Sequence, residues 1–528
     1  MDTKALRQKI LDLAIRGKLV PQDPNDEPAS VLLERIRAEK QQMVKDGKLK
    51  PKDIKNDTVI FKGDDNLHYE KFSDGTVKCI EDEIPFDVPN NWEWCRLQTI
   101  CAKEIKRGKA PKYEEKSSVI VFAQKCNTKS GFIDISKAKF LAQNTLKKYA
   151  DEDFLYYNDI IINSTGTGTL GRVGIYKKED DIYNIKIVPD SHITTVRTIP
   201  SEINAQYIYY FLKFNQLYFE NSGVGSTNQK ELKPEVISTF LIAIPPLNEQ
   251  NAIIDKVNMV NKHLSNLDNE KEQLKKLISS TKSKILDLSI RGKLVPQDPN
   301  DEPASVLLER IRAEKEELIK QGKIKRDKKE SVIFKGDDNS YYQDLPSNWI
   351  KIRLSTISEI ITKGTTPRGG KVAYSQSGIG FLRAENIAGY DKLDLSNLNY
   401  IDEESHNNYL KRSILKENDI LITIAGTLGR TAIVAQQALP LNTNQAVAIV
   451  RLVNNRLINV KYLVYALNSP IIKSDLLAKS VDMAIPNLSL ENIADCNISL
   501  PPLSEQKRIV EAIEKIFAVL DDIANQVA

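Results

Sequence analysis

The sequence predicts an α/β (α+β) protein. It should contain two similar globular domains joined by a pair of long antiparallel coiled-coil helices, with pseudo-two-fold symmetry. Three observations predict this class. The chain of 528 residues repeats itself once along its length. Each copy holds short β-branched stretches bounded by Gly, Asn, Asp and Pro, which are typical of strands. A stripe of apolar residues at heptad spacing lies between the copies and is typical of a long coiled-coil helix.

The repeat is nearly perfect in one segment, because residues 9–40 and 284–315 differ only where Ser289 replaces Ala14. Weaker matches follow in the same order: a tryptophan motif (88–100 and 345–357), a glycine motif (158–172 and 418–430) and a proline motif (244–250 and 500–506). The chain is therefore predicted to hold two diverged modules and a repeated helical segment. The predicted boundaries are 1–50 (N-terminal helical segment), 51–245 (first module), 246–325 (central helical region), 326–500 (second module) and 501–528 (C-terminal helix).

The helical segments are predicted from their periodicity and their end signals. Apolar residues from Ile253 to Leu288 follow a 4-3 spacing, which favours a long coiled coil over an ordinary amphipathic helix. The two chain ends together repeat this helix, so they are predicted to form its antiparallel partner and to lie near each other. A glycine stop at Gly292 and a proline-rich turn precede a second helix that runs to Gly322. Asp301 or a neighbour is expected to cap that second helix.

Each module is predicted to contain many short strands and a few short helices. The strands are expected where β-branched residues concentrate, at 118–123, 159–163, 192–199 and 445–453. Short helices are expected at 203–217 and 459–468.

The glycine motif of the first module spells G-x-G-x-x-G at residues 166–171. A dinucleotide loop needs a helix after these glycines, but the sequence RVGIY that follows is typical of a strand. A P-loop is also excluded, because Arg172 and Val173 stand where Lys and Ser or Thr are required. Both modules keep only G-T-L-G-R, which predicts a strand–turn–strand hairpin with Arg172 or Arg430 just past the turn. Either this turn is purely structural, or its arginine faces a polyanion.

Other candidate binding residues lie in two loops of each module. Short basic loops with Gly and Pro suit phosphate contacts, and arginine or amide side chains can read base edges. A solvated loop is the alternative for each of them. The candidate DNA-binding residues are Lys106, Arg107, Lys109, Gln124, Lys125 and Arg172 in the first module, and Lys363, Arg368, Arg383, Asn386 and Arg430 in the second.

Composition argues against several other classes of protein. The 75 basic and 71 acidic residues leave a net charge of +4, so any basic surface must be local. Five cysteines without a C-x-x-C pair and four scattered histidines favour a reducing cytoplasm without a zinc site. No apolar run is long enough for a membrane span. The sequence offers no catalytic cluster: Asp190 lacks the E-x-K partner of a nuclease, and both Pro-Pro pairs lack the flanking residues of an adenine methyltransferase.

The P-P-L-x-E-Q motif (245–250 and 501–506), the L-D-L-x-I-R-G-K-L-V-P-Q segment and the two N-W…G-T-L-G-R modules resemble the specificity subunit of type I restriction-modification systems. The resemblance covers nearly the whole chain and implies a non-catalytic subunit. Each module would be a target-recognition domain that reads one half of a bipartite double-stranded DNA site. The helices would set the spacing and dock two methyltransferase subunits, and motor/nuclease subunits would join that core. The resemblance places S-adenosylmethionine, ATP and Mg²⁺ on these partners. The alternative is a stand-alone DNA adenine methyltransferase with fused recognition domains.

Overall fold

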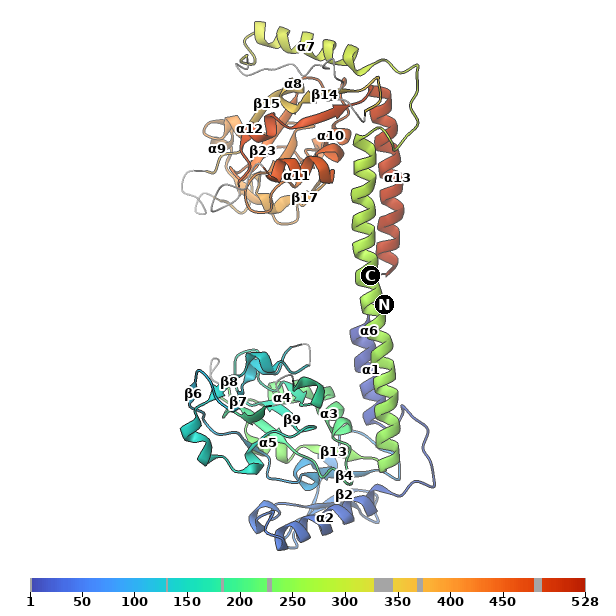
Figure 1. The fold of residues 1–528 in the computed structure, drawn as a ribbon, viewed down its shortest axis with the longest axis vertical. Helices are drawn as coiled ribbons and strands as arrows, with labels where there is room; N and C mark the ends of the chain where they lie inside the picture. The colour runs from blue at the N-terminus through green and yellow to red at the C-terminus, as the bar shows by residue number, and fades with distance from the viewer. Residues whose placement is uncertain are drawn as a thin grey trace. The chain divides into compact units, whose positions relative to one another are not determined.

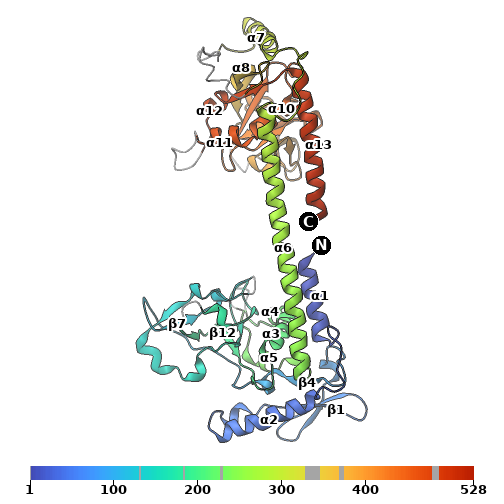
Figure 2. The same cartoon turned by 45° about the vertical axis from the view of Figure 1, so that its right-hand side comes forward.

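The computed structural model describes residues 2–129, 132–181, 185–225, 230–326, 345–367, 374–478 and 487–527. The chain divides into two compact units, Met1–Asn269 and Glu270–Ala528. The division falls within α6 (Leu247–Ile290), a helix of 44 residues (Figure 1). Each unit combines one mixed α/β domain with part of α6 and with shorter helices, in agreement with the predicted fold class (Figure 2). Among the described residues, no helix has the length and apolar character needed to cross a membrane.

In the first unit, α1 (Thr3–Ile15) runs antiparallel to the first part of α6. The start of α1 meets the middle of α6, where Thr3 Oγ1 donates to Asp268 Oδ1 at 2.8 Å. The chain beyond α1 returns to the start of α6, where Gln22 Nε2 donates to Glu249 Oε1 at 2.5 Å. Helix α2 (Ala29–Lys45) then follows the proline-rich turn, as predicted.

The second unit repeats this arrangement with the segments supplied in a different order. Helix α13 (Leu503–Val527) runs antiparallel to the last part of α6, where Lys282 Nζ lies 2.5 Å from Asp521 Oδ1. Beyond α6, Gln297 Nε2 donates to Glu505 Oε1 at 2.5 Å, and α7 (Ala304–Lys320) follows. The predicted antiparallel pairing is thus present within each unit. The predicted proximity of the chain ends depends on how the units are placed and stays a prediction.

The predicted heptad stripe of α6 is the face that packs. Ile253, Val257 and Leu264 are buried in the first unit, and Ile278 and Ile285 are buried in the second. Lys271 and Thr281, the two polar residues of the stripe, are half-buried. Leu277, an apolar residue outside the stripe, is 62% exposed. Burial therefore follows the 3.5-residue period along the whole helix, as a coiled-coil seam requires.

The first module contains two four-stranded sheets and two smaller ones. One has the order β10-β9-β12-β5, and its strands are Val173–Ile175, Ile160–Asn163, Ile193–Val196 and Lys106–Arg107. The other has the order β11-β7-β8-β6, and its strands are Lys186–Pro189, Val119–Phe122, Lys139–Leu141 and Tyr113–Glu114. Only the β7–β11 pairing is parallel among the ladders of these two sheets. The smaller sheets are β13-β4 (Leu241–Ile244 and Glu93–Arg96) and β1-β2-β3 (Val59–Lys62, His68–Lys71 and Val77–Cys79). The helices are α3 (Ala205–Phe214), α4 (Gln216–Asn221) and α5 (Pro234–Ser238).

The second module has the same plan. Its four-stranded sheet has the order β15-β23-β20-β21, with strands Ser358–Lys363, Val447–Leu452, Ile420–Thr423 and Thr431–Ile433. Its other strands are β14 (Ile350–Arg353), β16 (Ile379–Leu382), β17 (Ile387–Gly389), β18 (Lys392–Leu393), β19 (Asn399–Ile401), β22 (Leu441–Thr443) and β24 (Asn497–Leu500). Its helices are α8 (Leu354–Ile357), α9 (Glu403–Asn407), α10 (Val460–Leu467), α11 (Pro470–Ala478) and α12 (Leu490–Ala494). The strands and helices predicted from the sequence in both modules are confirmed.

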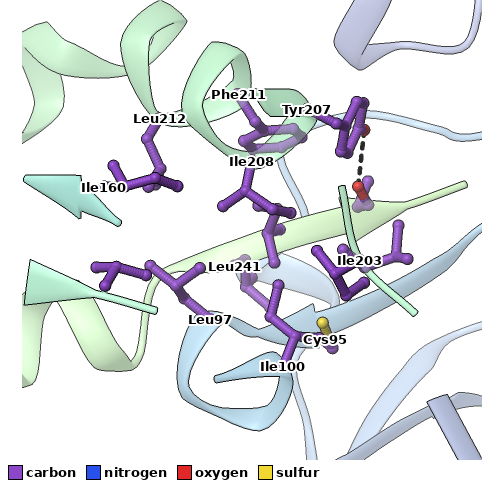
Figure 3. Packing of buried hydrophobic residues seen from close by; sticks show 14 of the residues in the cluster. Cys95, Leu97, Ile100, Ile160, Ile203, Tyr207, Ile208, Phe211, Leu212 and Leu241 are labelled. Atoms are coloured by element: carbon purple, nitrogen blue, oxygen red, sulfur yellow. Dashed lines mark hydrogen bonds between the residues drawn. The ribbon is translucent and has the colours of Figure 1, made fainter. Parts of the chain in front are cut away.

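The core of the first unit lies between α3 and the strands beside it (Figure 3). Ile208, Phe211 and Leu212 project from one face of α3 and are buried. Tyr207 is also buried, and its hydroxyl donates to the Ala243 carbonyl in β13 at 2.8 Å. Burying each such side chain contributes about 1.5–3 kcal/mol to the stability of the fold. This packing holds α3 against the neighbouring strands of the first module.

Of the residues expected to cap α7, Asp301 or a neighbour, it is the neighbouring Pro303 that stands at the N-cap, without a side-chain hydrogen bond. The first helical amide, of Ala304, instead donates to the Asn348 carbonyl of the second module at 3.0 Å. Asp301 accepts from Arg508 Nη2 at 2.7 Å. A distant backbone carbonyl and a distant arginine have therefore displaced the local capping interaction.

Candidate nucleic-acid interface

The G-T-L-G-R motif forms a hairpin in both modules, as predicted. Strands β9 and β10 pair antiparallel before and after the first motif, and β20 and β21 do so around the second. The first hairpin is closed by bonds from the Asn163 amide to the Arg172 carbonyl (3.0 Å) and from the Gly171 amide to the Asn163 carbonyl (2.8 Å). The second is closed in the same way between Thr423 and Arg430. A strand therefore follows each glycine motif, so neither motif is a nucleotide-binding loop.

The backbone connections correct the alignment of the two hairpins. The Ser164 amide donates to the His192 carbonyl at 2.8 Å, and the Ile424 amide donates to the Ala446 carbonyl at 2.8 Å. Ser164, and not Gly166, is thus the counterpart of Ile424. A match of the two sequences that pairs Gly166 with Ile424 is therefore out of register by two residues, because short glycine-rich stretches match in several registers. The residues inserted in the first module consequently lie within the turn.

The two hairpin arginines have different surroundings. Arg172 donates from Nη1 to the Asn127 carbonyl at 2.7 Å and from Nη2 to the Gly168 carbonyl at 3.1 Å, which braces the first hairpin. Arg430 lines a cleft of about 770 Å³ together with Lys473 of α11 and Ser279 and Ser283 of α6. This cleft lies wholly within the second unit. Arg430 and Lys473 make it suited to an anion such as a phosphate.

Electrostatics within the cleft support this description. Burial lowers the pKa of the Lys473 ammonium, and the charge of Arg430 lowers that pKa further. Two cations that repel each other in a partly dehydrated site gain more from a bound anion than two solvated cations do. The cleft is therefore the strongest candidate phosphate contact of the second module.

The predicted basic loop of the first module lies at β5 and just beyond it. Lys106 Nζ lies 3.3 Å from Glu152, Lys109 Nζ lies 2.5 Å from Asp153, and Arg107 pairs with Glu231. Arg107 also donates to the Leu232 carbonyl at 2.7 Å. The lysine pairs are partly exposed, so each contributes only about 0–1 kcal/mol, and a phosphate can replace the carboxylate at little cost.

Lys103 lies beside this loop, and its Nζ donates to the Glu152 carbonyl at 3.0 Å. Burial lowers the pKa of Lys103 to about 8, although the negative charge of Asp159 opposes the shift. No feature of the sequence marks Lys103, because its lowered pKa arises from packing.

A glycine anchors the basic loop of each module at the same place. A Cβ on Gly108 would lie 2.1 Å from the Pro189 carbonyl oxygen, and one on Gly364 would lie 2.2 Å from the Thr443 carbonyl oxygen. Only glycine permits this approach. The basic loop is thereby held against the turn that leads into β12 or β23. In the second module, Lys363 is exposed at the end of β15, while the predicted Arg368 lies outside the described residues.

The third group of predicted residues lies in 3-10 turns after β7 and β16. Lys125 is exposed, and Gln124 donates from Nε2 to Thr165 Oγ1 at 2.6 Å. In the second module, Arg383 pairs with Glu385. Asn386 is 2% exposed, and its side chain bonds to backbone groups at residues 383, 394 and 397. Asn386 thus closes its own loop here, and this geometry offers no support for a base contact by Asn386.

Nothing in the sequence analysis pointed to Thr165, which accepts from Gln124, or to His192, which contacts Thr165. Thr165 Oγ1 lies 2.7 Å from His192 Nδ1. The available signal was weak: a histidine at the start of a predicted strand, in a chain with four histidines. Nothing in the sequence indicates that residues 124, 165 and 192 meet.

The repeated tryptophan and proline motifs form a structural joint, distinct from the candidate interface. Glu249 is buried and accepts from Trp92 Nε1 at 2.9 Å and from Gln22 Nε2 at 2.5 Å. Glu505 accepts from Trp349 and Gln297 at the same two distances. Burial raises the pKa of both carboxyl groups. Each joint ties three segments of its unit together: the module, the start of a long helix and the repeated segment.

Comparison with known proteins agrees with the duplicated architecture. A family model for the type I restriction modification DNA specificity domain matches residues 89–276 and 346–527. The EcoEI type I restriction enzyme specificity subunit of Escherichia coli is 29% identical, over 99% of this chain and 90% of that protein. The EcoAI specificity subunit of Escherichia coli is 28% identical, over 97% of this chain and 89% of that protein.

A solved structure on complex assembly and conformational transition of the type I R-M system contains a chain of similar fold. Its TM-score is 0.50 at 16% identity, and the match covers 84% of this chain and 94% of that chain. This likeness concerns the fold alone. The family model, in contrast, matches well over half of the sequence and does so once in each unit. The chain therefore belongs to the family of type I restriction-modification DNA specificity subunits.

Proposed function

We propose that this chain is the DNA-recognition and assembly subunit of a type I restriction-modification complex and has no catalytic activity of its own. Each module acts as a target-recognition domain and reads one half of a bipartite double-stranded site. One observation carries the proposal: the modules share the backbone connections around their hairpins but differ in the side chains there. His192 and Ala446, for example, occupy equivalent positions. Two readers on one scaffold suit a site with two different halves.

Phosphate contacts position each module on the DNA, and base contacts then specify the sequence. In the second module, Arg430 and Lys473 suit a phosphate because they share one cleft. In the first module, Lys106, Arg107 and Lys109 are grouped at and beside β5, and the carboxylate partners of Lys106 and Arg107 are about half exposed. Because the chain is nearly neutral overall, such local groups must supply the electrostatic attraction to DNA.

The helices provide the assembly function. Residues 9–40 and 284–315 are nearly identical, so each unit presents nearly the same side chains on α2 or α7. Two equal surfaces favour two copies of one partner, and we assign them to two methyltransferase subunits, with motor/nuclease subunits joining this core. The partners would carry S-adenosylmethionine, ATP and Mg²⁺, and they would flip and methylate the target base. Such a complex works in the cytoplasm, where the DNA is.

The test is an exchange of residues 326–500 for the equivalent module of a relative with a different target. The hybrid is expressed with the partner genes, and methylome sequencing gives its target. We expect one half of the site to change and the other half to remain. A change in both halves would contradict the modular assignment. Methylation of DNA by the pure chain with S-adenosylmethionine would instead support the alternative of a stand-alone adenine methyltransferase.

A further inference from the structure

The first module carries a polar cluster that has no equivalent among the described residues of the second module. Its hairpin contains two more residues between the closing positions, Asn163 and Arg172, than the second hairpin has between Thr423 and Arg430. Thr165, in this longer turn, lies beside two side chains from other elements. Gln124 comes from the 3-10 turn after β7, and His192 comes from the turn before β12.

The three side chains form a chain of hydrogen bonds. Gln124 Nε2 donates to Thr165 Oγ1 at 2.6 Å, and Thr165 Oγ1 lies 2.7 Å from His192 Nδ1. Thr169 Oγ1 donates to Gln124 Oε1 at 3.3 Å and so orients the amide from its other side. Gly166 makes this packing possible, because a Cβ there would lie 2.4 Å from both Gln124 Oε1 and Thr169 Oγ1.

This chain of bonds accommodates a form of His192 that directs a donor outward. Thr165 Oγ1 accepts a hydrogen bond from Gln124, and its own hydroxyl proton can point toward Nδ1 of a neutral His192. In that tautomer the ring proton resides on Nε2, and in the imidazolium Nε2 also carries a proton. His192 presents an N–H donor at Nε2 in both of these forms, and the residue is exposed to solvent.

The second module keeps the backbone at these positions but not the side chains. The amides of Asp134 and Asp394 each bond at 2.8 Å to the carbonyl that ends the preceding 3-10 turn, which aligns the two turns. By this alignment Ala384 replaces Gln124. Ala446 replaces His192. The cluster is thus a difference between two otherwise matched scaffolds, at the place where a difference in sequence preference would have to arise.

The cluster also lies next to the predicted phosphate contacts. The Gly108 amide of the basic loop donates to the Ile193 carbonyl at 2.9 Å, directly after His192. Lys125 follows Gln124 and is exposed. A DNA backbone held by this loop would bring base edges toward His192.

Resting on the proposed function, we infer that His192, held by Thr165 and Gln124, reads a purine in the major groove of the half-site bound by the first module. The Nε2–H group donates to purine N7, an acceptor that lies in the major groove. Thr165 and Gln124 are positioning residues, which hold the imidazole at one angle and direct its donor outward. The Gln124 amide retains one N–H for a neighbouring acceptor.

The experiment uses the full-length chain purified with its methyltransferase partner and a pool of duplexes with randomised sequence. Bound duplexes are sequenced for the wild type, for His192→Ala and for His263→Ala, a matched control at an exposed histidine of α6. We expect His192→Ala to lose about tenfold in preference at one purine of one half-site. The other half-site should be unchanged, and His263→Ala should match the wild type. Thr165→Val should weaken the same preference, because it removes the hydroxyl that orients the ring.

A second measurement identifies the acceptor atom. A 7-deaza purine at the affected position removes N7, so it should weaken wild-type binding about tenfold and leave His192→Ala binding unchanged. An unchanged preference in His192→Ala, or an equal loss for all sequences, would overturn the inference. A fold defect of the first module is recognised because it would weaken the preference at every position of its half-site and not at one purine alone. If the wild type itself selects no sequence, the proposed function fails, which is a distinct result.

Discussion

At the scale of single residues, Arg172 and Arg430 show how one motif acquires two roles. Both follow the second glycine of G-T-L-G-R and occupy equivalent backbone positions. Arg172 is held by two carbonyl oxygens of its own module, whereas Arg430 lines a cleft with a second cation, Lys473. The first arginine therefore serves the fold of its hairpin, while the second suits a bound anion.

This difference predicts that alanine at the two positions affects two different quantities, DNA binding at Arg430 and stability at Arg172. Arg430→Ala should reduce the slope of log affinity for DNA against log salt by about 1, because one phosphate contact is lost. Arg172→Ala should instead lower the free energy of unfolding by about 1–3 kcal/mol, since two carbonyls lose their donor. Salt titrations of binding and denaturant unfolding measure the two quantities. Arg430→Lys, which keeps the charge, is the control, and an unchanged slope in Arg430→Ala would rule out the phosphate contact.

Lys103 predicts a dependence of DNA binding on pH. Since burial lowers its pKa to about 8, the folded protein favours the neutral amine. The neutral amine of Lys103 therefore contributes to the stability of the fold above pH 10.5, its pKa in the unfolded chain. This contribution is lost as the pH falls through about 8, because the buried amine must then take up a proton. A nearby phosphate favours the ammonium, so affinity should fall as pH rises from 7 to 9. Binding titrations across this range test the prediction. Lys103→Arg should remove the dependence, and its persistence in that variant would assign it to another group.

At the scale of elements, the hairpins depend on their glycines to different extents. Gly171 has φ +73°, and a Cβ there would lie 2.4 Å from the Glu220 amide nitrogen of α4. Gly168 has φ +75° but no neighbour within 4 Å of a Cβ. Gly429, the counterpart of Gly171, meets only the flexible Lys473 side chain at 3.5 Å. The first hairpin is thus packed tightly against a helix at one glycine only.

A matched series of alanine substitutions separates the two effects. Gly168→Ala and Gly429→Ala should each cost about 1–2 kcal/mol, because alanine is strained at positive φ. Gly171→Ala should cost about 1–3 kcal/mol more, since α4 must move to admit the Cβ. Denaturant unfolding gives these values. Equal losses at Gly168 and Gly171 would show that the contact with α4 adjusts without strain.

At the scale of the whole molecule, the same joint is built twice. In each unit, one buried glutamate at the start of a long helix binds a tryptophan of the module and a glutamine of the repeated segment. The repeated segment comes from the start of the chain in the first unit and from the middle of it in the second. The near identity of residues 9–40 and 284–315 is thus explained in part by the need to fit the same joint.

The duplication predicts that damage to one joint remains local. Glu249→Ala and Glu505→Ala each leave a buried tryptophan N–H without its acceptor, at a cost of about 1–3 kcal/mol. Differential scanning calorimetry should show that each substitution lowers one transition by about 2–6 °C and spares the other. The double variant Glu505→Ala/Trp349→Phe removes the donor as well, so its cost should be smaller than the sum of the costs of the two single variants if the unpaired N–H is the cause. If one substitution lowered the temperatures of both transitions, the two units would unfold together.

The sequence by itself determined the repeat, the strands and helices, the heptad face of α6 and the hairpin at each glycine motif. These features depend on spacing and on turn chemistry over a few residues, which a sequence displays directly. The sequence also excluded a nucleotide-binding loop by itself, because the residues after Gly171 are typical of a strand and not of a helix. The sequence did not determine which residue stands at the N-cap of α7, since the partners of Asp301 and of the first helical amide come from distant segments.

Only the tertiary structure decided which side chains meet. Gln124, Thr165 and His192 come from three elements, and the fold of the first module brings them together. Likewise, packing directs Arg172 to carbonyl oxygens and Arg430 to a cleft, although their local sequences agree. A buried polar group takes whichever partner the surrounding fold supplies, because an unpaired one is costly. The sequence therefore predicted the framework of each module, and long-range packing assigned the roles of its polar residues.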